Sequence, residues 1–367
     1  MRMDLIARRD FVKTVGYAGL AMTAVGQFAA RAEDAKKTTL ALVGCAHIHT
    51  PLFCDILSSR PDVTVKYVWD ATPAKAEKVA PDLKAKVAKD PAEIFGDSSV
   101  QCAVILSETA RHLELATAAA AAKKHLFVEK PLAGNSKDAT AIADAVEKAG
   151  VLFNMGYHLR AIPQINFVKE HIAKGSFGKI TRVHTAFCHG GLLEGMFDTD
   201  YKWVLDPKQA GVGGFGDVAT HSVDLLMWLL GDVEAVSADI RNVSGKYPDV
   251  DEVGEALCKM KSGVTACVAG ACVEPTNPYK LLVVGTEGHA MIFIEDRLYI
   301  KSKKIEGADG MRPWGKLPPG PPHSVVQLIE AINGKQMPLV TVREAAKDVK
   351  VLEAIYQAAR EKKWVTL

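Results

Sequence analysis

The feature that most constrains this chain is a regular alternation of short apolar runs and helical patterns between residues 38 and 157. Short β-branched runs that alternate with helices are typical of a parallel sheet with crossover helices. The predicted strands are Thr38–Val43, Val63–Trp69, Val100–Leu106, His125–Glu129 and Val151–Tyr157. The predicted helices are Pro51–Ser59, Pro73–Ala80, Thr109–Lys123 and Ser136–Ala149. We therefore expect an α/β, doubly wound Rossmann domain over residues 38–157.

The pattern changes after Tyr157. A predicted helix leads into a strand, and a glycine-rich segment then opens a second helix; these are Pro163–Lys174, Ile180–Phe187 and Asp217–Leu230. Strand-like runs then follow one another without helices, which favours an antiparallel sheet. They are Val233–Asn242, Glu255–Lys261, Val264–Val273, Leu281–Val284, Ala290–Ile294 and Leu298–Ile300. Predicted helices Ser324–Asn333 and Val342–Glu361 close a C-terminal α+β domain over residues 158–367 with a mainly antiparallel open sheet.

Residues 1–32 have the order of an export signal and are set aside from the fold. Arg8-Arg9 is followed by the apolar stretch Val15–Ala30 and then by small residues, which resembles a twin-arginine signal peptide. The alternative is a membrane anchor, but the stretch is shorter than the roughly 20 residues a helix needs to span a bilayer. We expect export of a folded protein by the Tat machinery to the periplasm or beyond.

Charge and cysteine content exclude two further classes of protein. Lys and Arg number 45 against 43 Asp and Glu, and no basic stripe with interleaved aromatic residues is present, so we expect no binding to nucleic acid. The seven cysteines are odd in number and scattered through apolar runs, which argues against a disulfide framework.

The segment after the first predicted strand is the candidate nucleotide-binding turn. In a G-x-G-x-x-G turn, glycines let the backbone approach a pyrophosphate at a helix N-terminus. Here Gly44 keeps the first position, Ala46 takes the second and His49 the third, with His47 between them. Asp70 ends the second predicted strand, where a carboxylate accepts hydrogen bonds from the adenosine ribose and repels the 2′-phosphate of NADP. We therefore expect NAD rather than NADP; the alternative is that Asp70 only begins a turn.

The same turn offers possible metal ligands. Cys45, His47, His49 and Cys54 alternate along it. Their spacing matches no standard structural zinc pattern, so we predict no metal and assign these residues to packing or to cofactor contact.

Five further segments carry a resemblance to a known family. They are Ser107–His112, Phe127–Leu132 with its Glu-Lys-Pro, Gly156–Arg160, Trp203–Gly214 and Asp217–Asp224. In this order they resemble the Gfo/Idh/MocA oxidoreductases over about residues 38–367. Ala219 stands where the family has a glycine, and the usual Thr-Pro after the fourth strand is missing.

The resemblance implies roles for individual residues. His221 would be the base that takes a hydroxyl proton while hydride leaves for the nicotinamide, Asp217 would orient its ring, and Lys130 would hydrogen-bond the reacting oxygen. Cofactor contacts would come from Gly44, Ala46, His47, His49, Asp70, Ser107, His112, Glu129 and Lys130, and substrate contacts from Tyr157, His158, Arg160 and Asp224. A buried core histidine and a surface lysine are the alternatives for His221 and Lys130.

These implications lead to three hypotheses of function. We expect an exported oxidoreductase that transfers hydride between a sugar or polyol and a tightly bound cofactor, because free NAD is scarce outside the cytoplasm. One alternative is an NAD-dependent glycosidase that transiently oxidises a sugar hydroxyl, eliminates the aglycone and then reduces the sugar again. The other is a non-catalytic binding protein with an altered nucleotide turn. By family analogy we also expect a homo-oligomer.

Overall fold

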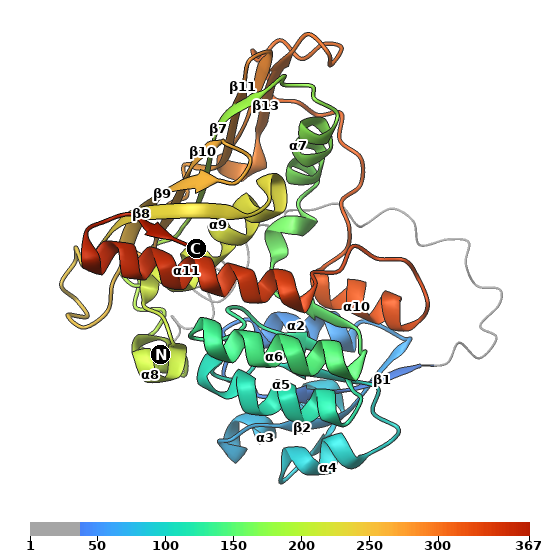
Figure 1. Ribbon diagram of the computed structural model, residues 1–367. Coiled ribbons are helices and arrows are strands. Elements are labelled where there is room, and N and C mark those ends of the chain that lie inside the picture. Colours follow the sequence, from blue (N-terminus) through green and yellow to red (C-terminus); the bar gives the residue numbers. More distant parts are fainter. Residues whose placement is uncertain (1–36) are drawn as a thin grey trace, which may run out of the picture. The chain divides into compact units, whose positions relative to one another are not determined.

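The computed structural model describes residues 37–367, so the predicted signal peptide lies outside the described residues. The described chain contains two sheets, both visible in Figure 1. None of its helices is long and apolar enough to cross a bilayer. The predicted fold, a parallel Rossmann sheet followed by a mainly antiparallel sheet, is confirmed.

Sheet A has six parallel strands in the order β3-β2-β1-β4-β5-β6. They are β1 (Thr38–Val43), β2 (Val63–Trp69), β3 (Lys86–Val87), β4 (Cys102–Ile105), β5 (His125–Val128) and β6 (Phe153–Met155). Helices α2 (Thr50–Ser58), α3 (Pro73–Leu83), α4 (Pro91–Gly96), α5 (His112–Ala121, after η1, Thr109–Arg111) and α6 (Ser136–Ala149) connect them. Strand order reverses between β1 and β4, so the loops that leave these strands open the crevice in which doubly wound sheets bind ligands.

Both faces of sheet A are buried, which explains the nearly continuous apolar runs of its strands. Leu40 and Leu42 of β1 point to the face covered by α2 and α3, while Ala41 and Val43 point to the face covered by α5 and α6. Because successive side chains of a strand point to opposite faces, the single apolar run of β1 contributes to the cores on both faces of sheet A.

Sheet B has eight strands in the order β13-β12-β11-β7-β10-β9-β8-β14. They are β7 (Ile180–Cys188), β8 (Val233–Arg241), β9 (Val253–Met260), β10 (Thr265–Ala271), β11 (Tyr279–Gly285), β12 (Gly288–Phe293), β13 (Leu298–Ser302) and β14 (Val365–Thr366). Every pairing is antiparallel except that of β7 with β10. The helices α7 (Pro163–Ala173, after η2, His158–Ala161) and α9 (Gly214–Leu230) pack on one face, and the short η3 (Lys202–Leu205) and α8 (Pro207–Ala210) precede α9.

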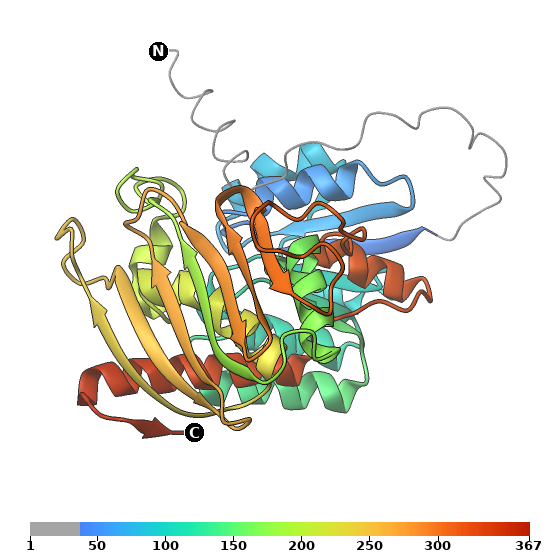
Figure 2. The ribbon, with the colours of Figure 1, turned by 90° about the horizontal axis from the view of Figure 1, so that it is seen from above.

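The last two long helices bind the two sheets together. Helix α10 (Ser324–Ile332) returns to sheet A and packs against β5 and β6, where Val325 and Leu328 join the core that contains Phe127. Helix α11 (Val342–Glu361) buries its first half against α6 and β6 and its second half against α9 and sheet B. Figures 1 and 2 show it running along both α6 and sheet B. The C-terminal segment therefore contributes to both cores.

Local capping explains where the best-defined helices begin and end. Asn135 accepts the amide of Asp138 at the start of α6, and Gly150 ends that helix in the left-handed region at φ 66°. Thr341 and Glu344 form a capping box at the start of α11. Helix α3 continues past Ala80 through Pro81 to Leu83, whereas β3 and α4 were not predicted because two strand residues and six helix residues give no periodic signal.

Candidate active site

The candidate site begins at the turn after β1. Gly44 has a φ of +91°, and a Cβ there would lie 2.5 Å from the backbone nitrogen of Ser107, so the turn requires glycine both for its conformation and for the approach of the loop after β4. Ser107 is buried and its hydroxyl donates to the Glu108 carbonyl. The two loops thus meet at the switch point of sheet A.

The backbone of this turn is partly used by the protein itself. The Cys45 amide donates to Asp70 Oδ2 (2.6 Å), and the His47 amide donates to the Leu106 carbonyl (3.0 Å). The amides of Ala46 and Ile48 have no acceptor within residues 37–367. Two amides just before α2 therefore remain to bind an anion such as a pyrophosphate.

Asp70 lies where the sequence placed it, at the end of β2. Its carboxylate is buried and also accepts the Thr72 amide at 2.7 Å. A carboxylate has about four acceptor positions. Two of these positions accept the amides of Cys45 and Thr72, and two remain for ribose hydroxyls.

Glu129, at the end of β5, meets both histidines of the turn. His49 Nδ1 donates to Glu129 Oε1 at 3.1 Å, and His47 Nε2 lies 3.9 Å from Glu129 Oε2. Glu129 is 1% exposed, and a Cβ on Gly156 would lie 2.4 Å from its Oε2. Burial lowers the pKa of His47 to about 3, so this imidazole is neutral at neutral pH.

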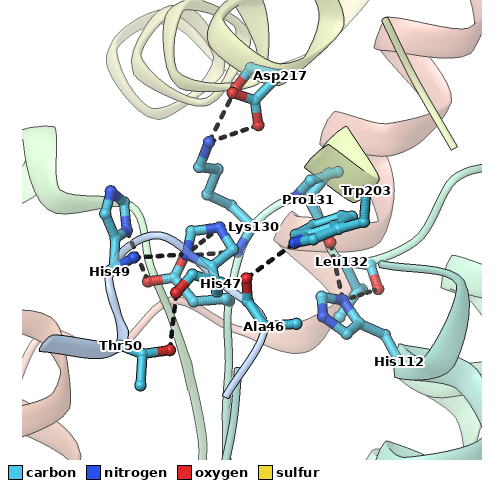
Figure 3. Close-up of polar contacts among 11 residues, drawn as sticks. Ala46, His47, His49, Thr50, His112, Lys130, Pro131, Leu132, Trp203 and Asp217 are labelled. Atoms are coloured by element: carbon cyan, nitrogen blue, oxygen red, sulfur yellow. Dashed lines mark hydrogen bonds and ion pairs between the residues drawn. The ribbon is translucent and has the colours of Figure 1, made fainter. Parts of the chain in front are cut away.

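Lys130 connects the two sheets. Its Nζ lies 2.8 Å from Asp217 Oδ1 and 3.1 Å from the Asp217 carbonyl, so a side chain that follows β5 reaches the first turn of α9 (Figure 3). Burial raises the pKa of Asp217, but the charge and hydrogen bond of Lys130 outweigh it and the pKa is lowered. The Asp217 carboxyl is therefore ionised at neutral pH.

His221 lies one turn further along α9, and it is 2% exposed. Its ring packs among Tyr157, His158 and Phe187, with a ring-centroid distance of 4.6 Å to each of the last two. Its Nδ1 is buried without a partner in the described chain. Burial first, then neighbouring charges that include His158 and Lys130, hold its pKa well below the usual value, so the ring is a neutral proton acceptor. Asp217 contacts Lys130 rather than this ring.

The predicted substrate residues fall into two groups. His158 lies beside His221, and the Tyr157 hydroxyl is 3.3 Å from Thr220 Oγ1. Arg160 and Asp224 instead form a buried ion pair with each other at 2.6 Å, which fastens η2 to α9. The first group borders the site, whereas the second holds together the elements that form it.

His112, predicted to contact the cofactor, is buried and positions the Lys130 loop. Its Nδ1 donates to the carbonyls of Pro131 (3.0 Å) and Leu132 (3.2 Å). The loop after β5, whose Lys130–Pro131 peptide is cis, is thus fastened from helix α5.

Two neighbours of the site were not predicted as site residues. Trp203 Nε1 donates to the Ala46 carbonyl at 2.8 Å (Figure 3). Leu192 and Phe197 of the same segment belong to one small core with Trp203 and Ala46. His189 follows β7 close enough to Asp217 for that carboxylate to influence its pKa. The segment around Trp203 resembles a motif of the family and could have pointed to this residue. No sequence pattern pointed to His189, because its position depends on the pairing of β7 with β10.

The site is closed in this structure. Lys130 is 5% exposed, and two cavities of about 300 and 280 Å³ lie beside it without being lined by Lys130 or His221. Both cavities are lined by Gly134 and Gly211. These two glycines pack closely, since a Cβ on Gly134 would lie 2.6 Å from the Gly211 Cα.

Comparison with known sequences decides the family. Residues 38–157 match the family described as oxidoreductase family, NAD-binding Rossmann fold, and residues 165–291 match the GFO/IDH/MocA C-terminal domain. Together the two matches span well over half of the chain. The chain belongs to the Gfo/Idh/MocA oxidoreductase family. The predicted family and the predicted NAD-binding fold are thereby confirmed.

Individual relatives of this Gfo/Idh/MocA protein are distant. Levoglucosan dehydrogenase of Pseudarthrobacter phenanthrenivorans is 26% identical over 54% of this chain and 53% of its own length. The scyllo-inositol 2-dehydrogenase (NAD(+)) of Bacillus subtilis is 27% identical over 65% of this chain and 68% of its own length. The chain thus spans about half to two thirds of these curated relatives. The WlbA dehydrogenase from Bordetella pertussis, solved with NADH and UDP-GlcNAcA, superposes with a TM-score of 0.79 at 22% identity over 90% of this chain and 98% of its own, which shows the shared fold.

The residues present fit a nicotinamide dinucleotide. The left-handed Gly44, the two amides without acceptors and the remaining acceptor positions of Asp70 all lie at the carboxyl edge of sheet A. Gly44, Ala46 and Asp70 would hold the pyrophosphate and ribose, and Glu129 and Lys130 would border the nicotinamide end.

Proposed function

We propose that this protein is an exported NAD-dependent oxidoreductase that transfers hydride between a sugar or polyol hydroxyl and a tightly bound cofactor. The observation that carries the proposal is the ion pair of Lys130 with Asp217, 2.8 Å long, which brings the nucleotide edge of sheet A to helix α9 one turn before His221. Two charged groups and a neutral imidazole thereby meet at the carboxyl edge of a dinucleotide-binding sheet.

The side chains suit the chemistry of an alcohol. When bound, the cofactor supplies the hydride acceptor. The hydroxyl proton passes to His221, whose lowered pKa keeps it neutral and able to accept. The Lys130 ammonium donates to the same oxygen and stabilises the charge that develops on it, and Asp217 fixes that ammonium in place. Burial strengthens these interactions because little water competes.

The carbohydrate part of the proposal is supported by the relatives. Curated proteins similar in sequence include dehydrogenases named for levoglucosan and for scyllo-inositol. Both compounds carry several neighbouring hydroxyl groups, so we extend that substrate class, a cyclic polyol or sugar, to this chain.

Two features support tight retention of the cofactor: the proposed export and the closed site. The twin-arginine-like Arg8-Arg9 supports transport to a compartment with little free NAD. The indole of Trp203 holds the Ala46 carbonyl, and its segment covers the turn. A cofactor seated beneath this segment would leave slowly.

The test is a content and turnover measurement. The protein is purified from the periplasm without added nucleotide, denatured and assayed for released nicotinamide by mass spectrometry; a sugar and polyol panel is then offered to the native protein. We expect close to one NAD(H) per chain and a change in its fluorescence with at least one sugar. An empty protein that binds neither NAD nor NADP would refute the proposal.

A further inference from the structure

The N-terminus of helix α9 is capped from outside the helix. The first four amides of an α-helix have no acceptor within it. In α9 these are the amides of residues 213–216, because the Asp217 amide already donates to the Gly213 carbonyl at 3.0 Å. Gly213 is the N-cap residue and has no side chain that could accept a hydrogen bond. The acceptors for these four amides must therefore come from other elements.

Tyr356 of helix α11 accepts two of these amides. Its hydroxyl oxygen lies 3.1 Å from the Gly213 nitrogen and 3.0 Å from the Gly216 nitrogen, and it donates its own proton to Asp251 Oδ2 at 3.1 Å. A hydroxyl has one donor and two acceptor positions, so all three are in use. Burial first, and then the Asp251 carboxyl, raise the pKa of Tyr356 well above its usual value, which keeps that proton on the hydroxyl.

Asp251, in the segment between β8 and β9, accepts the other two amides. Its backbone carbonyl accepts the Gly214 amide at 2.9 Å, and its Oδ1 accepts the Phe215 amide at 2.8 Å. Because its carboxylate also accepts the Tyr356 hydroxyl, the two residues form one connected cap. All four amides that lack an acceptor within α9 are thereby bonded.

The glycines at the start of α9 leave room for this cap. A Cβ on Gly213 would lie 2.1 Å from Asp251 Oδ2, and a Cβ on Gly216 would lie 2.6 Å from the Tyr356 hydroxyl oxygen. A larger residue at either position would push the capping group away from the amides. The glycine-rich sequence at the start of α9 therefore fits a helix that is capped by other elements.

The capped turn carries the group that holds Lys130. Asp217 directly follows the four capped residues, and its carbonyl oxygen and its Oδ1 lie 3.1 and 2.8 Å from Lys130 Nζ. Because one of these two contacts is to the backbone, a shift of the first turn of α9 would move the ammonium group with it. The position of the Lys130 ammonium thus depends on the cap.

We propose that Tyr356 is a positioning residue, which together with Asp251 fixes the first turn of α9 and thereby places the Lys130 ammonium at the reacting oxygen. Tyr356 acts through Asp217 and not by contact with substrate. Its effect on turnover rests on the proposed function, whereas the cap itself can be tested without any substrate.

The variant Tyr356→Phe removes the hydroxyl and keeps the ring. We expect kcat for an accepted sugar to fall about 10–100-fold, because a misplacement of about 1 Å at the reacting centre has an effect of this size, while KM changes by less than about threefold. Tyr299→Phe on β13 removes a tyrosine hydroxyl outside the cap and is the matched control, which should change neither constant. An unchanged kcat in Tyr356→Phe would overturn the proposal.

A double-mutant cycle separates positioning from a general loss of structure. In a Lys130→Met background no ammonium remains to be misplaced, so adding Tyr356→Phe should lower kcat by less than about a further twofold. A fall as large as that in the unmodified background would show that Tyr356 does not act through Lys130, and it too would overturn the proposal.

Hydrogen exchange measured by mass spectrometry tests the cap without a substrate. Peptides that cover residues 213–217 should exchange at least about tenfold faster in Tyr356→Phe and at an unchanged rate in Tyr299→Phe. Unchanged exchange in Tyr356→Phe would overturn the capping role even in a protein that oxidises sugars. Faster exchange in a protein that turns over no sugar would support the cap and refute only the proposed function. Circular dichroism confirms the fold, and Asp251→Asn replaces Tyr356→Phe in every measurement if that variant does not fold.

Discussion

At the level of single residues, the contacts of Lys130 fix the position of its ammonium group. Its ammonium bonds both the carboxylate and the carbonyl of Asp217, while the loop that carries it is fastened by His112. A lysine that could rotate freely would lose side-chain entropy each time it met a substrate. The pairing sets the position of the charge before substrate binds, which is what preorganised electrostatic stabilisation requires.

Replacing that charge tests its role. Lys130→Met should lower turnover of an accepted sugar by about 10²–10³-fold, because one preorganised donor to the reacting oxygen is lost. The NAD content of the purified protein should stay the same, since Lys130 would border only the nicotinamide end. Lys208→Met, on α8, is the control. Turnover within threefold of the unmodified protein would show that Lys130 is not a catalytic residue.

The position of a single site residue could be predicted from the sequence where it depends on a local pattern. Asp70 was placed at the end of β2 from its position after an apolar run, and the structure agrees. The partner of Asp217 was not foreseen. Residues 217 and 221 share a helix face by spacing, but Lys130 comes from another sheet and its charge attracts Asp217 more strongly than a neutral imidazole does.

At the scale of elements, the segment between β7 and α9 decides access to the turn. Leu192, Phe197 and Trp203 form one small core with Ala46. The Trp203 indole also donates to the Ala46 carbonyl. This segment therefore ties the C-terminal part of the chain to the nucleotide turn.

Removing only the indole hydrogen bond tests that link. Trp203→Phe keeps an aromatic ring in the core but no donor to Ala46. One net hydrogen bond contributes about 1 kcal/mol, so bound NAD should dissociate roughly fivefold faster. Stopped-flow displacement of the cofactor measures the rate, with Trp314→Phe as the matched control. An unchanged rate would mean that this segment does not retain the cofactor.

Helix α11 carries a second element-scale prediction. Ile355 is fully buried between the helix and sheet B. Ile355→Ala should lower the free energy of unfolding by about 2–5 kcal/mol through lost contacts and the cavity left behind. Because α11 packs on both cores, we expect both to unfold in one transition in urea, whereas two separated transitions would contradict the bridging role.

Element boundaries were predictable where capping residues mark them. Helix α6 begins and ends where Asn135 and Gly150 indicate, and α11 begins where Thr341 indicates. The start of α9 at Gly214 was missed by three residues, because its N-cap, Gly213, makes no side-chain bond. The parallel pairing of β7 with β10 also escaped prediction, since strand order in an open sheet depends on long-range packing rather than on local pattern.

At the scale of the whole molecule, buried neutral histidines couple stability to pH. Burial lowers the pKa values of His47 and His158 to about 3 and that of His221 well below its usual value. In the unfolded chain these rings titrate near 6.5. Below that pH the unfolded chain binds protons that the folded chain does not, so stability falls as pH falls.

The melting temperature should therefore drop between about pH 7 and about pH 5, with each such histidine contributing up to roughly 1.4 kcal/mol per pH unit. Burial raises the pKa values of three carboxyl groups, those of Asp224, Asp251 and Asp348, which acts in the opposite direction over this range. They are outnumbered by nine described histidines whose pKa burial lowers. Differential scanning calorimetry across the range measures the slope, and His158→Gln should make it shallower. A melting temperature that stays constant or rises on acidification would contradict this assignment.

The proposed function requires a nicotinamide ring between Lys130 and His221, on the turn that begins at Gly44. A high-resolution crystal structure of the protein isolated with its native cofactor tests it most directly. We predict density for the dinucleotide along the carboxyl edge of sheet A, with its ring between those two side chains. A turn that stays closed over that space, with the dinucleotide elsewhere or unable to bind at all, would contradict the account.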